Sequence, residues 1–385
     1  MTRSVSIFGA TGSVGQSALD LIAHDPGRWD VDVVTAHGSA DALAQAAKAC
    51  GARLAVVSDE AALPALKEAL AGTGIACAGG RAALEDAADR PVDVTLAAIV
   101  GAAGLMPTLR AVQRGGVVAI ANKEALVCAG PLILKAAEAS GARLLPVDSE
   151  HNAIFQVFDF ERPESVERII LTASGGPFRE KTLDEMRMMT AKQAVAHPVW
   201  SMGAKISVDS ATLMNKGLEL IEAERLFPVG EERLDVIVHR QSIVHSFVEY
   251  VDGSLLAQLG SPDMKTPIAY AMAWPERIET PVERLSLADI ARLDFEEPDA
   301  GRFPALRLAR EALRAGGSAP IRLNAANEVA VQAFLNDRIG FLDIAGTVER
   351  VLDAEAVCAA DTLDDVIDCD ARARLSAETM LKKVA

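Results

Sequence analysis

The first 148 residues alternate short apolar runs with alanine-rich segments, and this alternation limits the chain to few folds. Apolar runs typical of buried strands occupy 4–8, 31–35, 53–57, 94–100, 117–121 and 143–147. Segments with helical spacing occupy 14–23, 40–49, 60–71, 104–114 and 124–139. Continuous apolar strands that alternate with helices predict a parallel sheet covered on both faces. We therefore expect a doubly wound α/β domain over 1–148.

The remaining sequence changes character twice. Residues 149–273 mix helices and Gly/Pro turns with strand-like stretches at 166–173, 233–239, 243–250 and 254–259, which predicts an α+β domain. Residues 274–301 are rich in proline and charge and predict a connecting segment. Residues 302–385 carry only helical spacing and predict a C-terminal helical domain. Two or three domains are expected of 385 residues.

Bulk properties exclude several classes of protein. The net charge of −16 argues against a nucleic-acid partner, because no excess of Lys and Arg is available to replace phosphate counterions. The five cysteines form no C-x-x-C pair, which predicts reduced thiols. The longest uncharged apolar run, 94–106, is too short and glycine-interrupted to cross a membrane. The opening residues show no secretory signal, so we expect a cytoplasmic protein without a membrane partner.

A glycine-rich turn, GATGSVG, joins the first apolar run to the first helix. Gly9, Gly12 and Gly15 permit a tight turn and let backbone N–H groups reach a pyrophosphate at a helix N-terminus. Thr11 and Ser13 add hydroxyl donors. A purely structural turn is the alternative. The context predicts a Rossmann-like dinucleotide-binding domain.

The end of the second apolar run bears on which nicotinamide cofactor is bound. An NAD site usually places Asp or Glu there, to hold the ribose 2′-hydroxyl. This chain has His37, Gly38 and Ser39, so we expect a 2′-phosphate to meet no carboxylate, which favours NADP. No Arg or Lys is present either, so His37, Ser39 and backbone amides would hold the phosphate. A histidine of an ordinary surface loop is the alternative.

Carboxylates gather after the last apolar run of the predicted sheet. Asp148 and Glu150 follow the run 143–147, and Lys123 follows the run 117–121. Functional residues collect at the carboxyl ends of such strands. With Glu219, these carboxylates would supply three hard oxygen ligands, which suit Mg²⁺ or Mn²⁺ better than zinc. The alternative is a helix N-cap with acidic residues in its first turn.

Residues 197–223 combine donors for an anion with a carboxylate. A helix over MNKGLELIEAERL would place Asn215, Lys216 and Glu219 on one face. Together with Ser210, the Asn and Lys donors suit a phosphate, and Glu219 would lie one turn away. This spacing predicts a small phosphorylated ligand. A surface helix with a Lys–Glu pair is the alternative.

Two further loops contain residues that could contact or cover a bound ligand. TASGGPF, at 172–178, could close on an anion with Ser174 and backbone amides, or could be a plain turn. HPVWSMG, at 197–203, could cover a substrate with Trp200, or could be a packed loop anchored by that tryptophan.

The motifs GATGSVG, ANKEALV, PVDSEHNAIFQ, TASGGPF, HPVWSMGAKISVDSATLMNKGLELIEA and NAANEVAVQAFL occur in this order. Along essentially its full length the chain resembles the 1-deoxy-D-xylulose 5-phosphate reductoisomerase family. The resemblance implies a homodimer that uses NADPH and a divalent metal (Mg²⁺, Mn²⁺ or Co²⁺). It implies conversion of 1-deoxy-D-xylulose 5-phosphate to 2-C-methyl-D-erythritol 4-phosphate, in the non-mevalonate (MEP) route to isoprenoids.

The resemblance also implies roles for individual residues. The metal ligands would be Asp148, Glu150 and Glu219. The substrate phosphate would be held by Ser174, Ser210, Asn215 and Lys216. The rest of the substrate would be contacted or covered by Lys123, Ser149, His197 and Trp200. The cofactor would be bound by Thr11, Gly12, Ser13, Val14, His37, Gly38, Ser39, Asn122, Glu124 and Gly203. The residues with a catalytic role would be Lys123, Glu150, His197 and Glu219.

The tip of the second strand departs from the family pattern, which often has Gly followed by a basic residue where this chain has His37 and Gly38. Two other functions are compatible with parts of the sequence. One is an NADP-dependent sugar-phosphate dehydrogenase that does not rearrange the carbon skeleton. The other is an NADP-sensing regulator, which would be expected to lack the carboxylates or the phosphate donors that this chain has.

Overall fold

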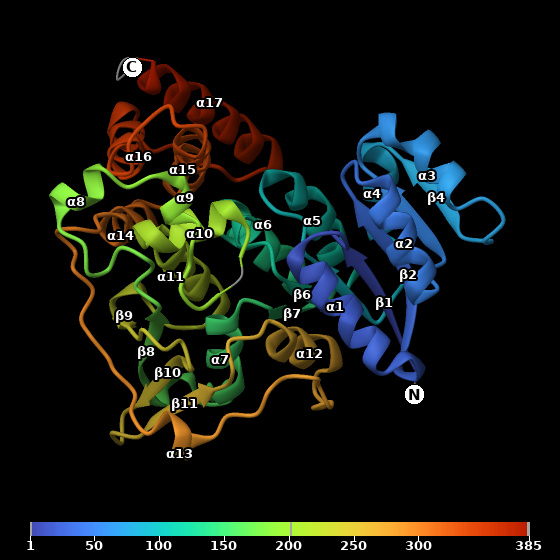
Figure 1. The fold of residues 1–385 in the computed structure, drawn as a ribbon, viewed down its shortest axis with the longest axis horizontal. Helices are drawn as coiled ribbons and strands as arrows, with labels where there is room; N and C mark the ends of the chain where they lie inside the picture. The colour runs from blue at the N-terminus through green and yellow to red at the C-terminus, as the bar shows by residue number, and fades with distance from the viewer. Residues whose placement is uncertain (1, 201, 383–385) are drawn as a thin grey trace. The chain divides into compact units, whose positions relative to one another are not determined.

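The computed structural model describes residues 2–200 and 202–382 (Figure 1). Contacts divide the chain into two compact units. Unit 1 comprises Met1–Ala125, Ile133–Asn152 and Asp263–Glu283. Unit 2 comprises Leu126–Leu132, Ala153–Pro262 and Arg284–Ala385. The finer division predicted from the sequence, with boundaries at 148, 273 and 301, stays a proposal.

A seven-stranded sheet, in which every neighbouring pair is parallel, forms the centre of unit 1, with the order β4-β3-β2-β1-β5-β6-β7. Its strands are β1 (Arg3–Phe8), β2 (Trp29–Ala36), β3 (Leu54–Val57), β4 (Ala76–Gly79), β5 (Val94–Ala97), β6 (Val117–Ile120) and β7 (Arg143–Pro146). This confirms the predicted Rossmann-like parallel sheet. The sequence did not predict β4, because its residues ACAG have little of the branched or aromatic character of strands.

The helices of unit 1 are α1 (Ser13–His24), α2 (Ala40–Cys50), α3 (Leu63–Ala69), α4 (Arg81–Ala88), α5 (Leu105–Arg114) and α12 (Lys265–Ala273), with most of α6 (Lys123–Ser140) and the start of α7 (Ser149–Val157). Helix α12 comes from a distant part of the sequence and packs against α1, β6 and β7. Asn152 ties α12 to the sheet, because its amide nitrogen donates to the carbonyl oxygens of Pro146 (2.9 Å) and Pro267 (3.4 Å).

The order of the strands predicts where unit 1 binds a ligand. Strand β1 lies between β2 and β5, so chain connections leave it in opposite directions on its two sides. In open α/β sheets, ligands bind in the crevice at the carboxyl ends of the strands where this reversal occurs. The glycine-rich turn follows β1 at this position (Figure 1).

A four-stranded sheet with the order β11-β10-β8-β9 belongs to unit 2. It consists of β8 (Val166–Ala173), β9 (Leu234–Val238), β10 (Val244–Tyr250) and β11 (Leu255–Leu259), and only the β8–β9 pair is parallel. All four strands lie where the sequence predicted them. The helices are α8 (Leu183–Arg187), α9 (Ala191–Ala194), α10 (Ala204–Thr212), α11 (Met214–Leu226), α13 (Leu287–Ile290), α14 (Ala305–Ala315), α15 (Ala319–Leu335), α16 (Asp343–Ala354) and α17 (Leu363–Leu381).

The C-terminal helices support α10 and α11. Helix α14 packs closely on α11, since a Cβ atom added to Gly217 would lie 2.8 Å from the Cβ of Ala309. Helix α15 contacts α10, where the amide of Asn327 donates a 2.8 Å hydrogen bond to the carboxylate of Asp209. Both of these side chains are buried. The helical segment therefore fixes the two helices that carry the predicted phosphate donors.

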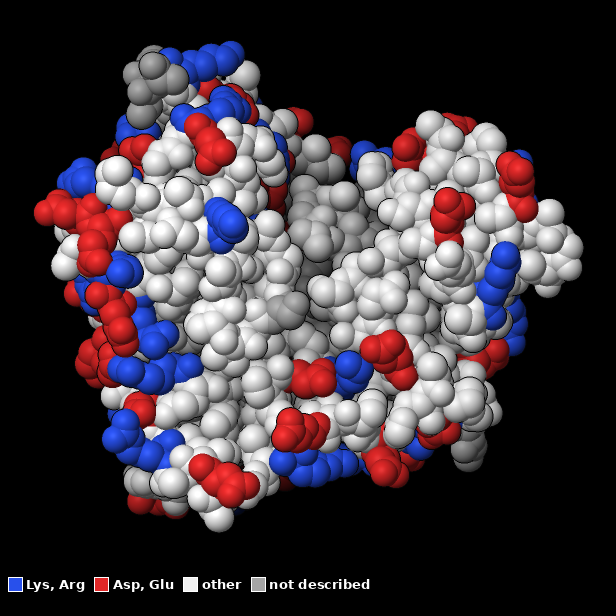
Figure 2. All heavy atoms as spheres, viewed as in Figure 1, with Lys and Arg blue, Asp and Glu red and all other residues white. Residues whose placement is uncertain are grey.

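Surface charge is mixed in sign. Acidic and basic side chains lie interspersed on the face shown in Figure 2. Within the described residues, no helix is long and apolar enough to span a bilayer.

Candidate active site

The glycine turn after β1 has the geometry of a phosphate-binding loop. Gly9 has a φ of +92°, and a Cβ atom there would lie 2.5 Å from the carbonyl oxygen of Ala98. A Cβ atom on Gly15 would lie 2.3 Å from the carbonyl oxygen of Gly9. Only glycine fits both positions, and Gly12 begins α1 without a side-chain cap on the helix. The first backbone N–H groups of α1 are therefore available, beside the glycine turn, to bind a pyrophosphate. Thr11 precedes Gly12, and Ser13 and Val14 are the first residues of α1.

Near the carboxyl end of β2, the structure places a carboxylate that the residues directly after β2 did not indicate. His37 contacts Ser58, with Nδ1 2.9 Å from the serine Oγ, and Ser39 precedes α2. A Cβ atom on Gly38 would lie 3.5 Å from Oδ2 of Asp59. The expectation that no carboxylate lies near this tip was therefore wrong. Asp59 comes from the end of the neighbouring strand β3, which a search along β2 does not reach.

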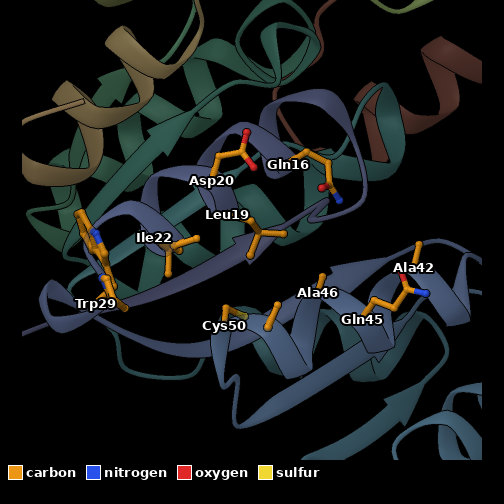
Figure 3. A pocket seen from close by; sticks show the side chains of 12 residues that line it. Gln16, Leu19, Asp20, Ile22, Trp29, Ala42, Gln45, Ala46 and Cys50 are labelled. Atoms are coloured by element: carbon orange, nitrogen blue, oxygen red, sulfur yellow. The ribbon is translucent and has the colours of Figure 1, made fainter. Parts of the chain in front are cut away.

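A groove of about 360 Å³ lies between α1 and α2 (Figure 3). Side chains such as Gln16, Leu19 and Ile22 project from α1 toward Ala46 of α2, and Trp29 lies at one end. None of the residues that line it was predicted to bind the cofactor. Its lining therefore shares no residue with the predicted cofactor site.

Asn122 follows β6 as the N-cap of α6, and its side chain also binds the loop that follows β5. Its side chain accepts from the N–H of Ala125 (3.0 Å) and donates to the carbonyl oxygens of Ile99 (2.6 Å) and Gly101 (3.1 Å). These three bonds use most of the hydrogen-bonding capacity of the amide. Glu124 lies in the first turn of α6 and is buried.

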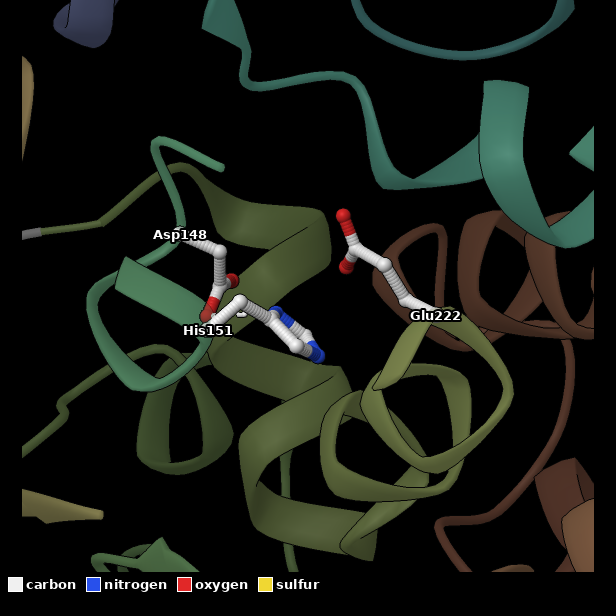
Figure 4. Close-up of side chains that lie close together, drawn as sticks. All are labelled: Asp148, His151 and Glu222. Carbon is white, nitrogen blue, oxygen red and sulfur yellow. Dashed lines mark ion pairs between the residues drawn. The ribbon is translucent and has the colours of Figure 1, made fainter. Parts of the chain in front are cut away.

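The end of β7 brings together the predicted polar residues of unit 1. Asp148 forms an ion pair with Lys123 at the start of α6, and its Oδ1 accepts from the N–H of Glu150 at 3.2 Å. Ser149 donates to the Glu150 carboxylate at 2.5 Å. The buried ring of His151 lies with Nδ1 3.3 Å from Asp148 Oδ1 (Figure 4). The two carboxylates thus lie at one strand end, beside a cation and an imidazole.

Helix α11 carries the third carboxylate. Glu219 is fully buried, and it forms an ion pair with the nearly buried Lys216. Asn215 donates to the other oxygen of Glu219 at 2.5 Å. The structure confirms the predicted helix and the shared face of these three side chains. Glu222, which is also drawn in Figure 4, is a further buried carboxylate on α11.

The hydroxyl groups predicted to bind phosphate meet in unit 2. Oγ of Ser174, which follows β8, lies 3.4 Å from Oγ of Ser210 on α10. Nε2 of His197 lies 2.8 Å from Ser174 Oγ. Burial, and next the positive charge of Arg179, lower the pKa of His197. The site therefore combines two hydroxyls with an imidazole that resists protonation.

The segment predicted to cover the substrate begins with a turn around His197. The backbone N–H groups of Val199 and Trp200 both donate to Nδ1 of His197. The indole of Trp200 lies beside His245 of β10, with ring centroids 6.0 Å apart. Gly203 precedes α10, while residue 201, within the predicted cover, lies outside the described residues.

Three family models match successive parts of the chain. "1-Deoxy-D-xylulose 5-phosphate reductoisomerase" matches residues 5–130, and the C-terminal domain of that name matches 144–227. "DXP reductoisomerase C-terminal domain" matches 259–376. A relative of that name from Rhodospirillum centenum is 59% identical over 379 residues, which is 98% of this chain and 94% of the relative. The chain belongs to the 1-deoxy-D-xylulose 5-phosphate reductoisomerase family.

Other members of the family are similar over the same length. The reductoisomerase of Zymomonas mobilis is 52% identical over 99% of this chain and 98% of its own. A solved structure of the Zymomonas mobilis enzyme in complex with NADPH has a TM-score of 0.94 at 51% identity, covering 99% of this chain and 98% of that chain. A second reductoisomerase, solved in complex with NADPH, fosmidomycin and magnesium, has a TM-score of 0.95 at 42% identity, covering 99% of both chains.

Sequence reasoning missed three residues at these places: Asp59, His151 and Arg179. His151 stands within the quoted motif PVDSEHNAIFQ and could have been found by its spacing of three from Asp148 on a helix. Asp59 becomes a neighbour of the predicted residues only through the fold, whereas Arg179 directly follows the predicted loop 172–178 in the sequence.

Proposed function

We propose that this protein catalyses the NADPH- and metal-dependent conversion of 1-deoxy-D-xylulose 5-phosphate to 2-C-methyl-D-erythritol 4-phosphate. The observation that carries the proposal is the face of α11, where Asn215 and Lys216 stand one turn from the buried Glu219. A phosphate clamp beside a hard oxygen ligand suits a phosphorylated, metal-chelating substrate. Membership of the family supports the same reaction.

We assign the metal ligands to Asp148, Glu150 and Glu219. Their chemistry fits the ion, because all three offer only carboxylate oxygens, as Mg²⁺, Mn²⁺ and Co²⁺ accept. A bound divalent cation supplies Lewis-acid stabilisation of oxyanions. The relative crystallised with magnesium supports this assignment. Lys123 pairs with Asp148 and Lys216 pairs with Glu219, so these two carboxylate charges are compensated inside the protein.

The phosphate of the substrate is assigned to Ser174, Ser210, Asn215 and Lys216. Hydroxyl, amide and ammonium groups all donate to an oxyanion, and the lysine adds the positive charge. Binding at this remote group holds the reacting carbons in position. Lys123 and Ser149 are assigned to the oxygen-bearing carbons. His197 and Trp200 are assigned to the cover that excludes water.

NADPH is assigned to the glycine turn of unit 1. Backbone N–H groups from Thr11 to Val14 suit its pyrophosphate, and the loop from His37 to Ser39 is assigned to its 2′-phosphate end, although Asp59 also lies near Gly38. Asn122, Glu124 and Gly203 are assigned to the nicotinamide half. Bound NADPH supplies the hydride. The relative solved with NADPH, at 51% identity, supports the cofactor.

We further propose a homodimer in the cytoplasm. Strand β11 is an edge of the sheet in unit 2 and exposes Leu255 (50%), Leu256 (47%) and Leu259 (38%). Exposed apolar edge strands attract partners, and a second copy would cover this one. Sedimentation at micromolar concentration should give twice the monomer mass of 40.6 kDa.

The carbon skeleton of the product tests the reaction. Incubation with 1-deoxy-D-xylulose 5-phosphate, NADPH and Mg²⁺ should give a branched polyol phosphate, identified by carbon NMR. A reduced product with an unbranched skeleton would instead support a sugar-phosphate dehydrogenase without rearrangement. Binding of NADPH without any product would support a cofactor-sensing regulator.

A further inference from the structure

The segment that follows β3 lies against the loop that follows β2. Beyond the paired strands, the N–H of Ser58 donates to the carbonyl oxygen of Ala36 at 2.9 Å. The N–H of Asp59 donates to the carbonyl oxygen of His37 at 3.0 Å. The side chains also meet, because Nδ1 of His37 lies 2.9 Å from Oγ of Ser58. Main-chain and side-chain contacts therefore hold Asp59 beside the loop 37–39.

The two carboxylate oxygens of Asp59 have different surroundings. Oδ1 accepts from the N–H of Ala61 at 3.0 Å, which caps the short helix η2 (Glu60–Ala62). Oδ2 lies beside the loop, because a Cβ atom added to Gly38 would lie 3.5 Å from it. One oxygen thus fixes the side chain, and the other lies next to the loop to which the 2′ end of the cofactor is assigned.

The negative charge of Asp59 is not compensated by a neighbouring cation. Within the described residues, no ion pair joins this carboxylate to a Lys, Arg or His. Apart from His37, the loop 37–39 contains no basic residue. The side chain is half-buried, and solvent ions screen a partly buried charge less than an exposed one. A phosphate bound at this loop would therefore lie close to an uncompensated carboxylate.

A carboxylate at this place acts on the two nicotinamide cofactors in opposite ways. In dinucleotide-binding domains, an acidic residue accepts from the ribose 2′-hydroxyl of NADH, whereas a basic residue accommodates the 2′-phosphate of NADPH. The acidic residue usually follows the second strand, where this chain has His37. Asp59 brings a carboxylate to the same loop from the next strand of the sheet. The residues after β2 therefore favour NADPH, while the contact from Asp59 opposes it.

We propose that Asp59 is a specificity-determining residue of the cofactor site: its Oδ2 accepts from the 2′-hydroxyl of NADH and repels the 2′-phosphate of NADPH. Asp59 thereby reduces the preference for NADPH and makes NADH a second, weaker cofactor of this protein. The proposal rests on the proposed function, through the assignment of the 2′ end of the cofactor to His37, Gly38 and Ser39.

Direct binding of the two dinucleotides to the full-length protein, without substrate, tests the proposal. Calorimetric titrations give Kd for NADPH and for NADH. Asp59→Asn removes the charge and keeps an oxygen that can cap η2. The ratio of Kd for NADH to Kd for NADPH should rise about tenfold, because NADPH binds more tightly and NADH more weakly. An unchanged or lower ratio would overturn the proposal.

Fragments of the cofactors and a second variant separate charge from shape. Adenosine 2′,5′-bisphosphate carries the 2′-phosphate without the nicotinamide half, and Asp59→Asn should strengthen its binding several-fold. Adenosine 5′-monophosphate, which has a 2′-hydroxyl instead, should bind more weakly to the same variant. Asp59→Ser removes the charge and also keeps a capping oxygen, so it should reproduce both changes. Opposite changes in the two variants would show that shape sets the ratio, and would overturn the proposal.

Glu60→Gln is the matched control. It removes the same charge from the next residue, whose Oε2 lies beside Gly80, 3.9 Å from a Cβ atom added there. This variant should keep the wild-type ratio; a rise equal to that of Asp59→Asn would show that net charge is responsible, against the proposal. A wild-type protein that binds neither dinucleotide would contradict the proposed function, and this inference with it. NADPH binding with a ratio that Asp59→Asn leaves unchanged would overturn this inference alone.

Discussion

Glu219 shows how a buried charge is tolerated in this protein. Its side chain is fully buried and Lys216 is only 3% exposed. Removing two such charges from water costs several kcal/mol each, which their ion pair and the bond from Asn215 offset. Such a site persists in a folded protein when function requires a carboxylate there, as a metal ligand does.

Glu219→Gln tests that role. The change keeps the shape of the side chain and removes a ligand charge, so affinity for Mn²⁺ should fall at least about tenfold. Turnover should fall further, while far-ultraviolet circular dichroism stays unchanged. Glu224→Gln, on the half-exposed side of the same helix, should leave Mn²⁺ binding intact. Normal Mn²⁺ affinity in Glu219→Gln would remove this residue from the metal site.

Gly176 is the residue that lets the loop of Ser174 approach α10. Its φ is +66°, and a Cβ atom would lie 2.6 Å from the carbonyl oxygen of Ser210. In Gly176→Ala the left-handed backbone alone costs about 1–2 kcal/mol, and the contact adds to it. The KM for substrate should therefore rise about tenfold or more. Gly27→Ala, whose Cβ atom would meet no atom within 4 Å, should leave KM unchanged. Equal values for both would contradict the proposed approach.

At the scale of elements, the junction of α10 and α11 shapes the proposed phosphate site. Leu213 lies between the two helices with a φ of 61°, a conformation that costs a residue with a side chain about 1–2 kcal/mol. Its side chain is buried in the core of unit 2, which compensates for that cost. The sharp junction would let Ser210 near the end of one helix and Lys216 at the start of the next bind the same anion, as we propose.

Asn327→Ala tests whether the C-terminal helices hold this junction in place. The variant removes the bond from α15 to the buried Asp209, which also pairs with Lys205 at 2.9 Å. Loss of a bond to a charged group should lower the free energy of unfolding by about 1.5–3 kcal/mol, measured with urea. The KM for substrate should rise as well. Asn336→Ala, at the exposed end of α15, should change neither quantity. A stable Asn327→Ala protein with normal KM would separate α15 from the site.

At the scale of the whole molecule, regular patterns made most of the fold predictable. Strands such as β8 begin and end where the apolar alternation of the sequence does. β4 and α4 were missed because their alanine-rich residues carry little pattern. The packing of α12 on the sheet of unit 1 was not predictable, since the contact joins residues more than 100 positions apart.

The contacts of the candidate site also fall into those that the sequence predicts and those that it does not. Residues close in sequence, such as Lys216 and Glu219, were predicted together because helical spacing fixes their distance. Asp59 approaches Gly38 from the segment after a neighbouring strand, and His197 approaches Ser174 from another loop. Such pairs depend on tertiary packing, which one sequence does not reveal.

One assay tests the metal and cofactor assignments together. NADPH oxidation is followed at 340 nm with 1-deoxy-D-xylulose 5-phosphate and Mg²⁺, then with excess EDTA, then with Mg²⁺ restored. We predict oxidation that requires the substrate, stops with EDTA, returns with Mg²⁺, and is slower with NADH. Oxidation that continues undiminished in excess EDTA, or that never depends on this substrate, would contradict the proposed function.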